Sequence, residues 1–435
     1  MNFFLILFGK FIVAFSRALN LGNGSTWPGH IALMKNKNFI REIKAQNAKL
    51  KIILIAGTNG KTTTSKLVRT ILEKDGKKVF QNEAGANLIN GVASSLILNS
   101  GLNGRINKDF AIFEIDENSL PLVLKELTPD YLVILNLFRD QLDRYGEVNI
   151  IADKWDIALD QLPDTTTIVL NADDPQIAYL AKGVKAKVSY FGLNDNEEMN
   201  NNSHQAVDSI YCPNCGHKLI FKKTFFSHLG DWECPSCGRK RPGITVDCSP
   251  AYPLPGLYNK YNIHAAVLVA QLLNINEKTT KSALQIFSPA FGRQEIVDID
   301  GKKVQLFLSK NPTSFNESLR TIASLNAKHL LLVLNDRIPD GRDVSWIWDT
   351  ALEEFVDKFS IITVSGDRVY DMAVRIKYAS NEFKIQNSKF KIEENLDDAI
   401  RKSLEQTKVG ETLYILPTYS AMLEVRKIIT GKKIL

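Results

Sequence analysis

A short glycine-containing loop between a strand and a helix constrains this chain more than any other feature of its sequence. The segment Lys51–Ala56 has the character of a buried strand, and a helical pattern follows from Thr62. Between them, glycines let backbone N–H groups face an anion, and the helix N-terminus adds partial positive charge. Lys61 can reach the β- and γ-phosphates of a nucleotide, and the Thr62 hydroxyl can bind Mg²⁺. The expected nucleotide-binding residues are Gly57, Thr58, Asn59, Gly60, Lys61, Thr62 and Thr63.

Strand and helix patterns alternate along most of the chain. Strands are expected at 51–56, 110–115, 131–135 and 167–170, and again at 304–308, 329–334, 360–364 and 412–416. This alternation predicts an α/β fold with a parallel sheet covered by helices on both faces. A length of 435 residues allows about three units of roughly 150 residues each. We expect a helical segment at 1–50, a nucleotide-binding domain at 51–295 with an insertion at 211–241, and a smaller α/β domain at 296–435.

Acidic side chains follow the strand expected at 110–115. In open parallel sheets, ligands bind beyond the carboxyl ends of the strands. A carboxylate there can hold the Mg²⁺ that bridges nucleotide phosphates. Glu114 is the expected Mg²⁺ ligand, whereas Asp116 and Glu117 are either further site residues or solvated loop charges. The polar run 136–146 follows the next strand directly and indicates a second loop of the same site.

Four of the five cysteines fall within one short stretch of the chain. So few cysteines argue against a disulfide-stabilised extracellular scaffold, and two CPxCG knuckles instead predict a metal site. Four thiolates close a tetrahedral Zn²⁺ shell with no open position, so the zinc is expected to be structural. The expected zinc ligands are Cys212, Cys215, Cys234 and Cys237. We expect His217 and His228 to be ordinary surface residues and Cys248 to be an inert apolar one.

The start of the chain is rich in aromatic residues at helical spacing. The repeating residues are Phe3, Phe4, Leu7, Phe8, Phe11, Ile12 and Phe15, interrupted by Lys10 and Arg17. No run of about 18 uncharged apolar residues occurs, so an integral membrane protein is not expected. The helix either packs on the protein's own core or a partner, or lies on a membrane surface. The net charge of +6 permits contact with phosphates or an anionic membrane but requires neither.

Together, these motifs resemble those of the Mur ligase family of ATP-dependent amide-forming enzymes. The matching segments are 57–64, Glu114, the Asn136…Asp140…Asp143 run, 171–174, 258–262 and 292–295, in the family's order over residues 51–295. The resemblance implies that Lys61 and Thr62 bind phosphates and Mg²⁺, and that Glu114 binds Mg²⁺. The expected fold is therefore a P-loop parallel-sheet ATPase domain with an inserted zinc ribbon, followed by a smaller α/β domain.

The same resemblance assigns the remaining nucleotide contacts and the reaction class. Asn259 and Asn262 lie where the family contacts adenine, and Arg293 lies where it contacts the ATP phosphates or ribose. The implied reaction phosphorylates a carboxylate to an acyl phosphate, which an amine then attacks. Each step suits a preorganised cationic site around the phosphoryl group.

Three departures from the family pattern narrow the choice of group within the family. The phosphate loop starts at Gly57, so we expect no additional N-terminal domain of the kind carried by Mur ligases that act on UDP-linked precursors. Gln141 replaces the usual His of the acidic run. The segment 309–312 stands where many members place an Asp. These differences leave second-metal and amino-acid binding unassigned.

The cysteine insertion and the C-terminal residues indicate one group within the family. A Mur-type ATPase with a four-cysteine ribbon and a distinct C-terminal domain resembles the MurT group, the ligase subunits of lipid II isoglutaminyl synthase. Segments 309–312 and 335–349 match that group's C-terminal domain. The resemblance implies a GatD-type glutaminase partner, whose Cys and His release ammonia from glutamine. It also implies that Asp349 supplies an acid to that pair, since a carboxylate orients a His and stabilises its charged form. Alternatively, Asp349 is an acid at the start of a helix over 351–355.

The implied protein is a cytoplasmic ligase at the inner face of the membrane that acts on lipid II. It would activate the α-carboxylate of D-glutamate in the stem peptide, and ammonia would then give D-isoglutamine. A folylpolyglutamate-synthase-like ligase is one alternative, although that class lacks the ribbon and the 345–349 run. An ATPase that binds nucleic acid is the alternative from another class, although nucleic acid is not the expected partner. Its basic face would come from Lys218, Lys222, Lys223, Arg239, Lys240 and Arg241.

Overall fold

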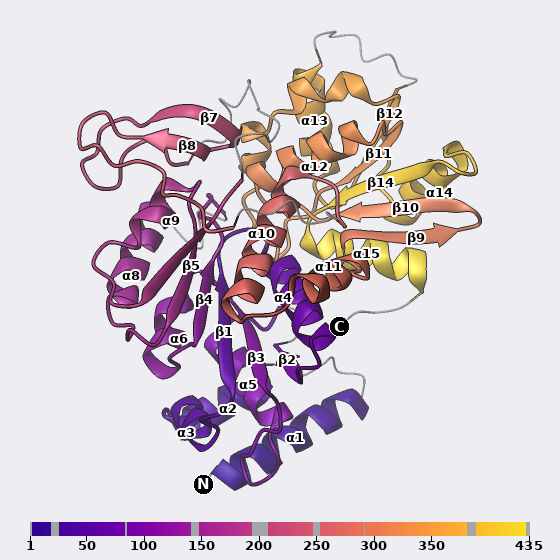
Figure 1. Ribbon diagram of the computed structural model, residues 1–435. Helices are drawn as coiled ribbons and strands as arrows, with labels where there is room; N and C mark the ends of the chain where they lie inside the picture. The colour runs from indigo at the N-terminus through magenta and orange to yellow at the C-terminus, as the bar shows by residue number, and fades with distance from the viewer. Residues whose placement is uncertain are drawn as a thin grey trace.

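Two six-stranded sheets form the framework of the molecule in the computed structural model (Figure 1). The structure describes residues 2–18, 26–82, 85–140, 148–193, 208–246, 253–290, 292–380 and 389–431. The first sheet is built by residues 51–191 and the second by residues 293–417. Among the described residues, no helix is both long and apolar enough to cross a membrane.

All neighbouring strands of the first sheet are parallel, in the order β2-β3-β1-β4-β5-β6. The strands are β1 (Lys51–Ala56), β2 (Val79–Gln81), β3 (Phe110–Ile115), β4 (Tyr131–Ile134), β5 (Thr167–Asn171) and β6 (Lys187–Phe191). The inner strands are largely apolar because helices cover both faces of the sheet, and the polar Glu114 and Asn171 lie near their carboxyl ends. Since β1 lies between β3 and β4, the loops that follow these three strands meet at one edge.

Helices cover the two faces of the first sheet with separate hydrophobic cores. One face carries α4 (Lys61–Lys74), α10 (Leu257–Leu272) and α11 (Glu277–Gln285). The other carries α3 (Phe39–Gln46), α5 (Ile89–Asn99), α6 (Leu120–Glu126), α8 (Val148–Leu159) and α9 (Pro175–Tyr179). Two further helices, α1 (Asn2–Ala18) and α2 (Trp27–Lys35), pack on the outer side of α5. They form the end of the molecule farthest from the second sheet (Figure 1).

The second sheet has the order β13-β12-β11-β14-β10-β9. Its strands are β9 (Arg293–Ile299), β10 (Lys302–Phe307), β11 (His329–Val333), β12 (Ile361–Ser365), β13 (Phe390–Ile392) and β14 (Thr412–Pro417). Only the β9–β10 hairpin is antiparallel among these described pairs. One face packs α12 (Pro312–Ser324), α13 (Val369–Ala379) and the 3₁₀ helices η1 (Ser345–Asp349), η2 (Leu352–Glu354) and η3 (Val356–Lys358). The other packs α14 (Leu396–Gln406) and α15 (Tyr419–Thr430).

The cysteine insertion is a two-stranded antiparallel hairpin of β7 (Ile220–Phe226) and β8 (Leu229–Glu233). Its knuckles lie at one end and its turn at the other. The hairpin is anchored to the loop after β5, because Trp232 Nε1 donates to the Ala172 carbonyl at 3.0 Å. Arg241 Nε also donates to Asp173 Oδ1 at 2.6 Å. These contacts hold the hairpin turn beside the carboxyl ends of the first sheet.

The eight strands expected from the sequence are present, with ends that differ by two residues at most. Within the two six-stranded sheets, the four further strands β2, β6, β9 and β13 lack a clear sequence signal. The sequence does not predict the hairpin strands β7 and β8 as strands either. β2 and β13 are three residues long, and β6 and β9 lie at sheet edges with partly exposed side chains. The boundary expected after residue 295 falls inside β9, because Arg293 already pairs with Phe307 of the second sheet.

Candidate active site

The phosphate loop between β1 and α4 requires glycine at two positions. Gly57 and Gly60 have φ angles of 135° and 92°, which residues other than glycine rarely adopt. A Cβ atom on Gly60 would lie 2.1 Å from Asn262 Oδ1, and one on Gly57 would lie 3.0 Å from the Asn136 backbone nitrogen. The loop is therefore fixed both by its backbone geometry and by close neighbours on α10 and after β4.

The loop that follows β4 holds the phosphate loop in shape. The Asn136 side chain accepts from the Asn59 N–H at 2.9 Å and donates to the Asn59 carbonyl at 3.1 Å. The Thr58 hydroxyl likewise accepts from the Phe138 N–H at 3.0 Å and donates to the Phe138 carbonyl at 3.2 Å. These paired hydrogen bonds preorganise the backbone that would face the phosphates.

Lys61 begins α4 and is buried beneath the loop. Its ammonium donates to the Gly57 carbonyl, to the Thr58 carbonyl at 3.3 Å and to Glu117 Oε2 at 3.2 Å. Burial opposes ionisation of Glu117, but the charges of Lys61 and Lys310 outweigh it and lower the pKa of that carboxyl. Glu117 is thus a buried site residue and not a solvated loop charge, and Asp116 is buried as well.

Glu114 lies opposite the first turn of α4. One carboxylate oxygen accepts from the Thr62 hydroxyl at 2.8 Å, and the other accepts from the Ser65 hydroxyl at 2.8 Å. Neighbouring oxygens in an octahedral Mg²⁺ shell lie about 3 Å apart, given metal–oxygen distances of 2.0–2.1 Å. Thr62 and Glu114 therefore fit a shared Mg²⁺ ion. Ser65, which sequence reasoning missed, lies one turn after Thr62 and orients the carboxylate.

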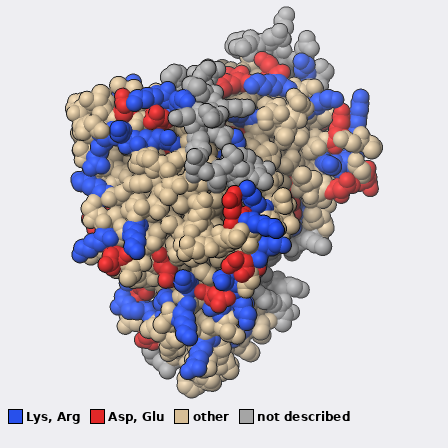
Figure 2. Space-filling model, viewed as in Figure 1, with Lys and Arg blue, Asp and Glu red and all other residues tan. Residues whose placement is uncertain are grey.

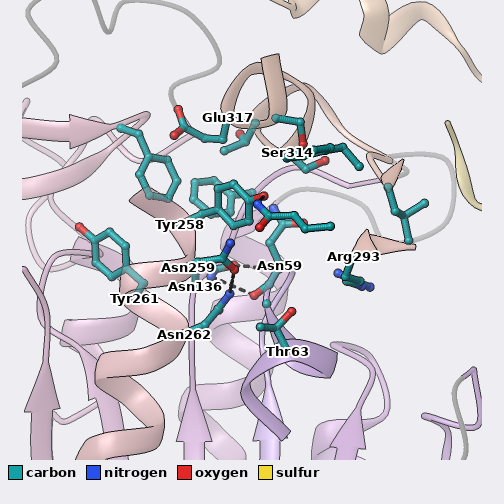
Figure 3. A pocket seen from close by; sticks show the side chains of 18 of the residues that line it. Asn59, Thr63, Asn136, Tyr258, Asn259, Tyr261, Asn262, Arg293, Ser314 and Glu317 are labelled. Carbon is teal, nitrogen blue, oxygen red and sulfur yellow. Dashed lines mark hydrogen bonds between the residues drawn. The ribbon is translucent and has the colours of Figure 1, made fainter. Parts of the chain in front are cut away.

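A cleft opens beside this cluster, between the two sheets (Figure 3). Aromatic and apolar walls with a few convergent polar groups are typical of a site for a small organic ligand. The lining residues come from five places: Asn59 and Asn136 from the first sheet's loops, Thr63 from α4, Asn259 and Asn262 from α10, Arg293 from β9, and Ser314 and Glu317 from α12. The cleft thus brings together six residues predicted to bind nucleotide: Asn59, Gly60, Thr63, Asn259, Asn262 and Arg293.

Aromatic rings and one orphaned amide form the far wall of the cleft. Phe138, Phe226, Tyr258 and Tyr261 supply flat apolar surface. Gln294 Nε2 donates to the Pro255 carbonyl at 2.9 Å and to the Tyr258 hydroxyl at 2.5 Å. A carbonyl can only accept, so this contact fixes which end of the amide is the NH₂ group. Gln294 Oε1 is then a buried acceptor with no partner within the described residues.

Glu317 is a second lining residue that sequence reasoning missed. Only 4% of its surface is exposed, and it forms an ion pair with Arg320 one turn later on α12. Burial raises the pKa of Glu317 to about 7, although the positive charge of Arg320 opposes that shift. No sequence pattern marks this position, because its burial arises only where α12 meets the cleft.

Two contacts cross the cleft from one sheet to the other. Lys310, which precedes α12, forms an ion pair with Asp140, which follows β4. Burial raises the pKa of Asp140, while the nearby Lys310 opposes that shift. Asn311 Nδ2 also donates to Asn59 Oδ1 of the phosphate loop at 3.3 Å. The two halves of the cleft are therefore tied together directly at the phosphate end.

Asp349 does not join the phosphate cluster. It ends η1 at the surface, its side chain is 51% exposed, and its carboxylate lies 3.8 Å from Arg139 Nη1. The alternative was that Asp349 is an acid at the start of a helix over 351–355. Only the three-residue 3₁₀ helix η2 forms there, directly after Ala351. Two residues of the acidic run, Gln141 and Asp143, lie outside the described residues, as does Cys248.

The four cysteines converge at the end of the β7–β8 hairpin. All four sulfur atoms lie within 4.8 Å of one another, with 3.6 Å between Cys212 and Cys237 and 3.5 Å between Cys215 and Cys234. Sulfurs bound to one tetrahedral zinc ion at 2.3 Å lie about 3.8 Å apart, so the cluster fits a zinc ion.

His217 is exposed, but the surface position expected for His228 is wrong. His228 is buried in the hairpin turn, with its Nε2 3.4 Å from Asp174 Oδ2 and its ring against Phe138. The sequence gives no hint of this because the hairpin turn is buried only by folding back onto the first sheet.

Comparison with known proteins places the whole chain in one family. A model of the Mur ligase middle domain matches residues 55–270, and a model of the MurT ligase C-terminal region matches residues 308–422. The MurT subunit of lipid II isoglutaminyl synthase from Streptococcus pneumoniae is 32% identical, over 95% of this chain and 94% of that protein. The Staphylococcus aureus subunit is also 32% identical, over 92% and 91%.

Solved structures show the same fold at lower identity. A pseudomurein peptide ligase type C from Methanothermus fervidus superposes with a TM-score of 0.65 at 22% identity, covering 88% of this chain and 79% of that one. A Mycobacterium tuberculosis folylpolyglutamate synthase gives a TM-score of 0.60 at 14% identity, covering 94% and 99%. At these identities the likeness establishes the fold alone.

Proposed function

Because the chain belongs to the MurT group of the Mur ligase family, we propose that it is the ligase subunit of a lipid II isoglutaminyl synthase. The chain is an ATP-dependent ligase of the Mur type. The observation that carries the finer proposal is the match to MurT subunits along almost the whole of both chains, which spans the cleft and the C-terminal residues around Asp349.

The proposed reaction proceeds in two steps within the cleft. The α-carboxylate of D-glutamate in the lipid II stem peptide attacks the γ-phosphorus of ATP, and ADP leaves. Ammonia then attacks the acyl carbon, and phosphate leaves as a proton is lost, which gives D-isoglutamine. Lys61 and Arg293 would offset the negative charge on the transferred phosphoryl group, and Thr62 and Glu114 would hold a Mg²⁺ ion, which would supply further positive charge for the phosphates.

The nucleotide would lie across the cleft with its phosphates at the glycine loop. The first turn of α4, from Gly60 to Thr63, supplies backbone N–H groups at that end, and Thr63 adds a hydroxyl, while Gly57, Thr58 and Asn59 shape the loop. Asn259 and Gln294 offer polar groups at the other end, next to the aromatic wall, and Asn262 lies between them and the glycine loop, beside Gly60. The charge of the phosphates matches a loop that ends at the N-terminus of α4.

The zinc is proposed to be structural. Four thiolates complete its shell, so no open position remains for a substrate. The ion would fix the knuckles and, through β7 and β8, the position of Phe226 on the wall of the cleft.

Ammonia is proposed to come from a GatD-type glutaminase docked near η1. Asp349 is exposed there, so a carboxylate of this chain can reach a His of a second protein. With a lipid-linked substrate, the complex would work in the cytoplasm at the inner face of the membrane.

The nucleic-acid alternative loses support from the contacts of its basic residues. Arg241 is bound by Asp173 at 2.6 Å, and Lys222 forms an ion pair with Glu233 at 2.6 Å. Two of the six basic side chains thus already have acidic partners within the protein, which weakens the basic face that nucleic acid would require.

The direct test is reconstitution from purified components. The chain, a GatD-type glutaminase, ATP, Mg²⁺ and glutamine should convert lipid II to its amidated form, detected by mass spectrometry. Lys61→Ala should abolish ADP release while the zinc content stays unchanged. Lipid II that remains unamidated with the unaltered chain would refute the assigned substrate.

A further inference from the structure

Helix α1 is apolar on both sides, although it packs against the protein on only one. Ile6, Gly9 and Val13 form the packed side, and Ile6 and Val13 are almost fully buried. A Cβ atom on Gly9 would lie 3.0 Å from Ile97 and 3.1 Å from Pro28, so α1 sits tightly on α5 and α2. Contacts on the packed side alone therefore hold α1 on the rest of the protein.

The opposite side of α1 is an exposed stripe of large apolar residues. Its members, each between 45% and 72% exposed, are Phe3, Phe4, Leu7, Phe8, Phe11 and Phe15. The neighbouring helix α2 exposes Trp27 and Met34 as well. We call these eight residues the N-terminal patch. A helix that is hydrophobic on all sides is normally buried, so we expect the exposed side of α1 to bind another molecule or surface.

The net charge of the protein is concentrated at the same end. Residues 1–50 contain seven Lys and Arg and one acidic residue, whereas the other 385 residues contain 47 of each sign. The whole charge of +6 therefore belongs to the segment that carries the patch. Its one acid, Glu42, accepts hydrogen bonds from Asn2 at 2.7 Å and Asn36 at 2.9 Å. Figure 2 shows Lys and Arg side chains across this end of the molecule.

We propose that the N-terminal patch binds the surface of an anionic phospholipid bilayer. An apolar stripe beside concentrated positive charge matches a membrane with negative headgroups, whereas a protein partner would not require this excess of one sign. Helix α1 has 17 residues, and no described helix is fit to span a bilayer, so α1 would lie flat in the interface. The purpose of this binding rests on the proposed function: membrane binding would hold the cleft near a lipid-linked substrate.

The test measures vesicle binding of the full chain by flotation. Vesicles of phosphatidylglycerol and phosphatidylcholine, without lipid II, are compared with vesicles of phosphatidylcholine alone. We expect at least about tenfold tighter binding to the anionic vesicles, weakened by added salt. The variant Phe4→Gln/Phe8→Gln/Phe11→Gln should bind at least about tenfold less, since Gln keeps the helix and removes the apolar surface. The matched control is Ile157→Gln/Ile338→Gln/Val409→Gln, three apolar residues elsewhere that are 70–77% exposed against 51–72% for the three Phe residues, and it should bind normally.

Other occupants of the patch give distinguishable results. Equal vesicle binding by the triple Phe variant and the unaltered chain would overturn the proposal. A triple Phe variant that binds vesicles normally but fails to co-purify with the glutaminase would assign the patch to a protein interface. Amidation of detergent-solubilised lipid II with free ammonia reports the proposed function separately. If the chain binds vesicles but does not amidate lipid II in that assay, the proposed substrate is refuted and the membrane-binding proposal is not.

Discussion

Single side chains set the chemistry of the cleft, and Gln294 illustrates how. Its NH₂ group is held by Pro255 and Tyr258, its φ angle is 63°, and its Oε1 atom is buried without a partner. A buried acceptor left unpaired costs free energy unless a ligand donates to it. The exocyclic amino group of adenine is such a donor, which makes Gln294 the expected selector of the base.

Replacing Gln294 with Leu should weaken discrimination between nucleotides. With the acceptor gone, the KM for ATP should rise roughly tenfold, the value of one hydrogen bond of about 1–1.5 kcal/mol. Inosine triphosphate lacks the amino group, so its use should change little. The ratio of kcat/KM values for the two nucleotides measures this, and an unchanged ratio would exclude the assigned role.

Glu317 should make stability depend on pH. Burial raises its pKa from 4.5 to about 7, so its neutral form is favoured in the folded protein. A carboxyl with a raised folded pKa stabilises the fold most below its unfolded pKa, and this contribution is lost as pH rises through about 7. Relative to Glu317→Gln, the unaltered chain should lose about 3 kcal/mol of unfolding free energy between pH 4.5 and 7.5. Urea titrations at several pH values test this, and parallel curves for the two proteins would contradict it.

Asp349 should matter for one nitrogen source only. Asp349→Asn should leave amidation from free ammonia intact but reduce glutamine-dependent amidation by at least about 100-fold, because an amide cannot stabilise a charged His. The control is Asp357→Asn, another exposed acid of the same region. Equal loss with both nitrogen sources would show that Asp349 does not act on the glutaminase.

At the scale of elements, the β7–β8 hairpin joins the four-cysteine cluster to the cleft. Its knuckles carry the four cysteines, while Phe226 near its turn stacks on Phe138 and meets Tyr261 edge-on. The sequence predicts the knuckles because four thiolates at that spacing have one dominant use. It does not predict the buried turn with His228, because that contact depends on where the hairpin folds back.

Loss of zinc should therefore affect ATP use at a distance. We expect one zinc ion per chain by elemental analysis. Cys215→Ser should lower the zinc content and raise the KM for ATP severalfold, because β7 no longer fixes Phe226. Ser309→Ala, a change outside the hairpin, should leave the zinc content unaltered. A zinc-free chain with a normal KM for ATP would show that the hairpin does not support the cleft.

At the scale of the whole molecule, the ion pair between Asp140 and Lys310 ties the two sheets together. Asp140→Asn should leave the Lys310 ammonium largely buried with Glu117 as its remaining acidic neighbour, and should destabilise the protein by about 2 kcal/mol. This is below the range for fully buried pairs because Lys310 is partly exposed and keeps that neighbour. Asp140→Asn/Lys310→Met should restore much of this stability. Thermal unfolding of the single and double variants measures the coupling, and additive losses would show that the pair is not coupled.

The sequence by itself determined the glycine loop between β1 and α4, the parallel α/β framework and the convergence of four cysteines. Those features rest on local physics: glycine geometry at Gly57 and Gly60, apolar runs in buried strands, and knuckle spacing. Only the tertiary structure decided the roles of Glu117, Ser65, Gln294 and Glu317, because burial and pairing arise where distant segments meet. The excess of positive charge in residues 1–50 can be counted from the sequence. Only the tertiary structure shows that the aromatic stripe of α1 stays exposed at the same end of the molecule.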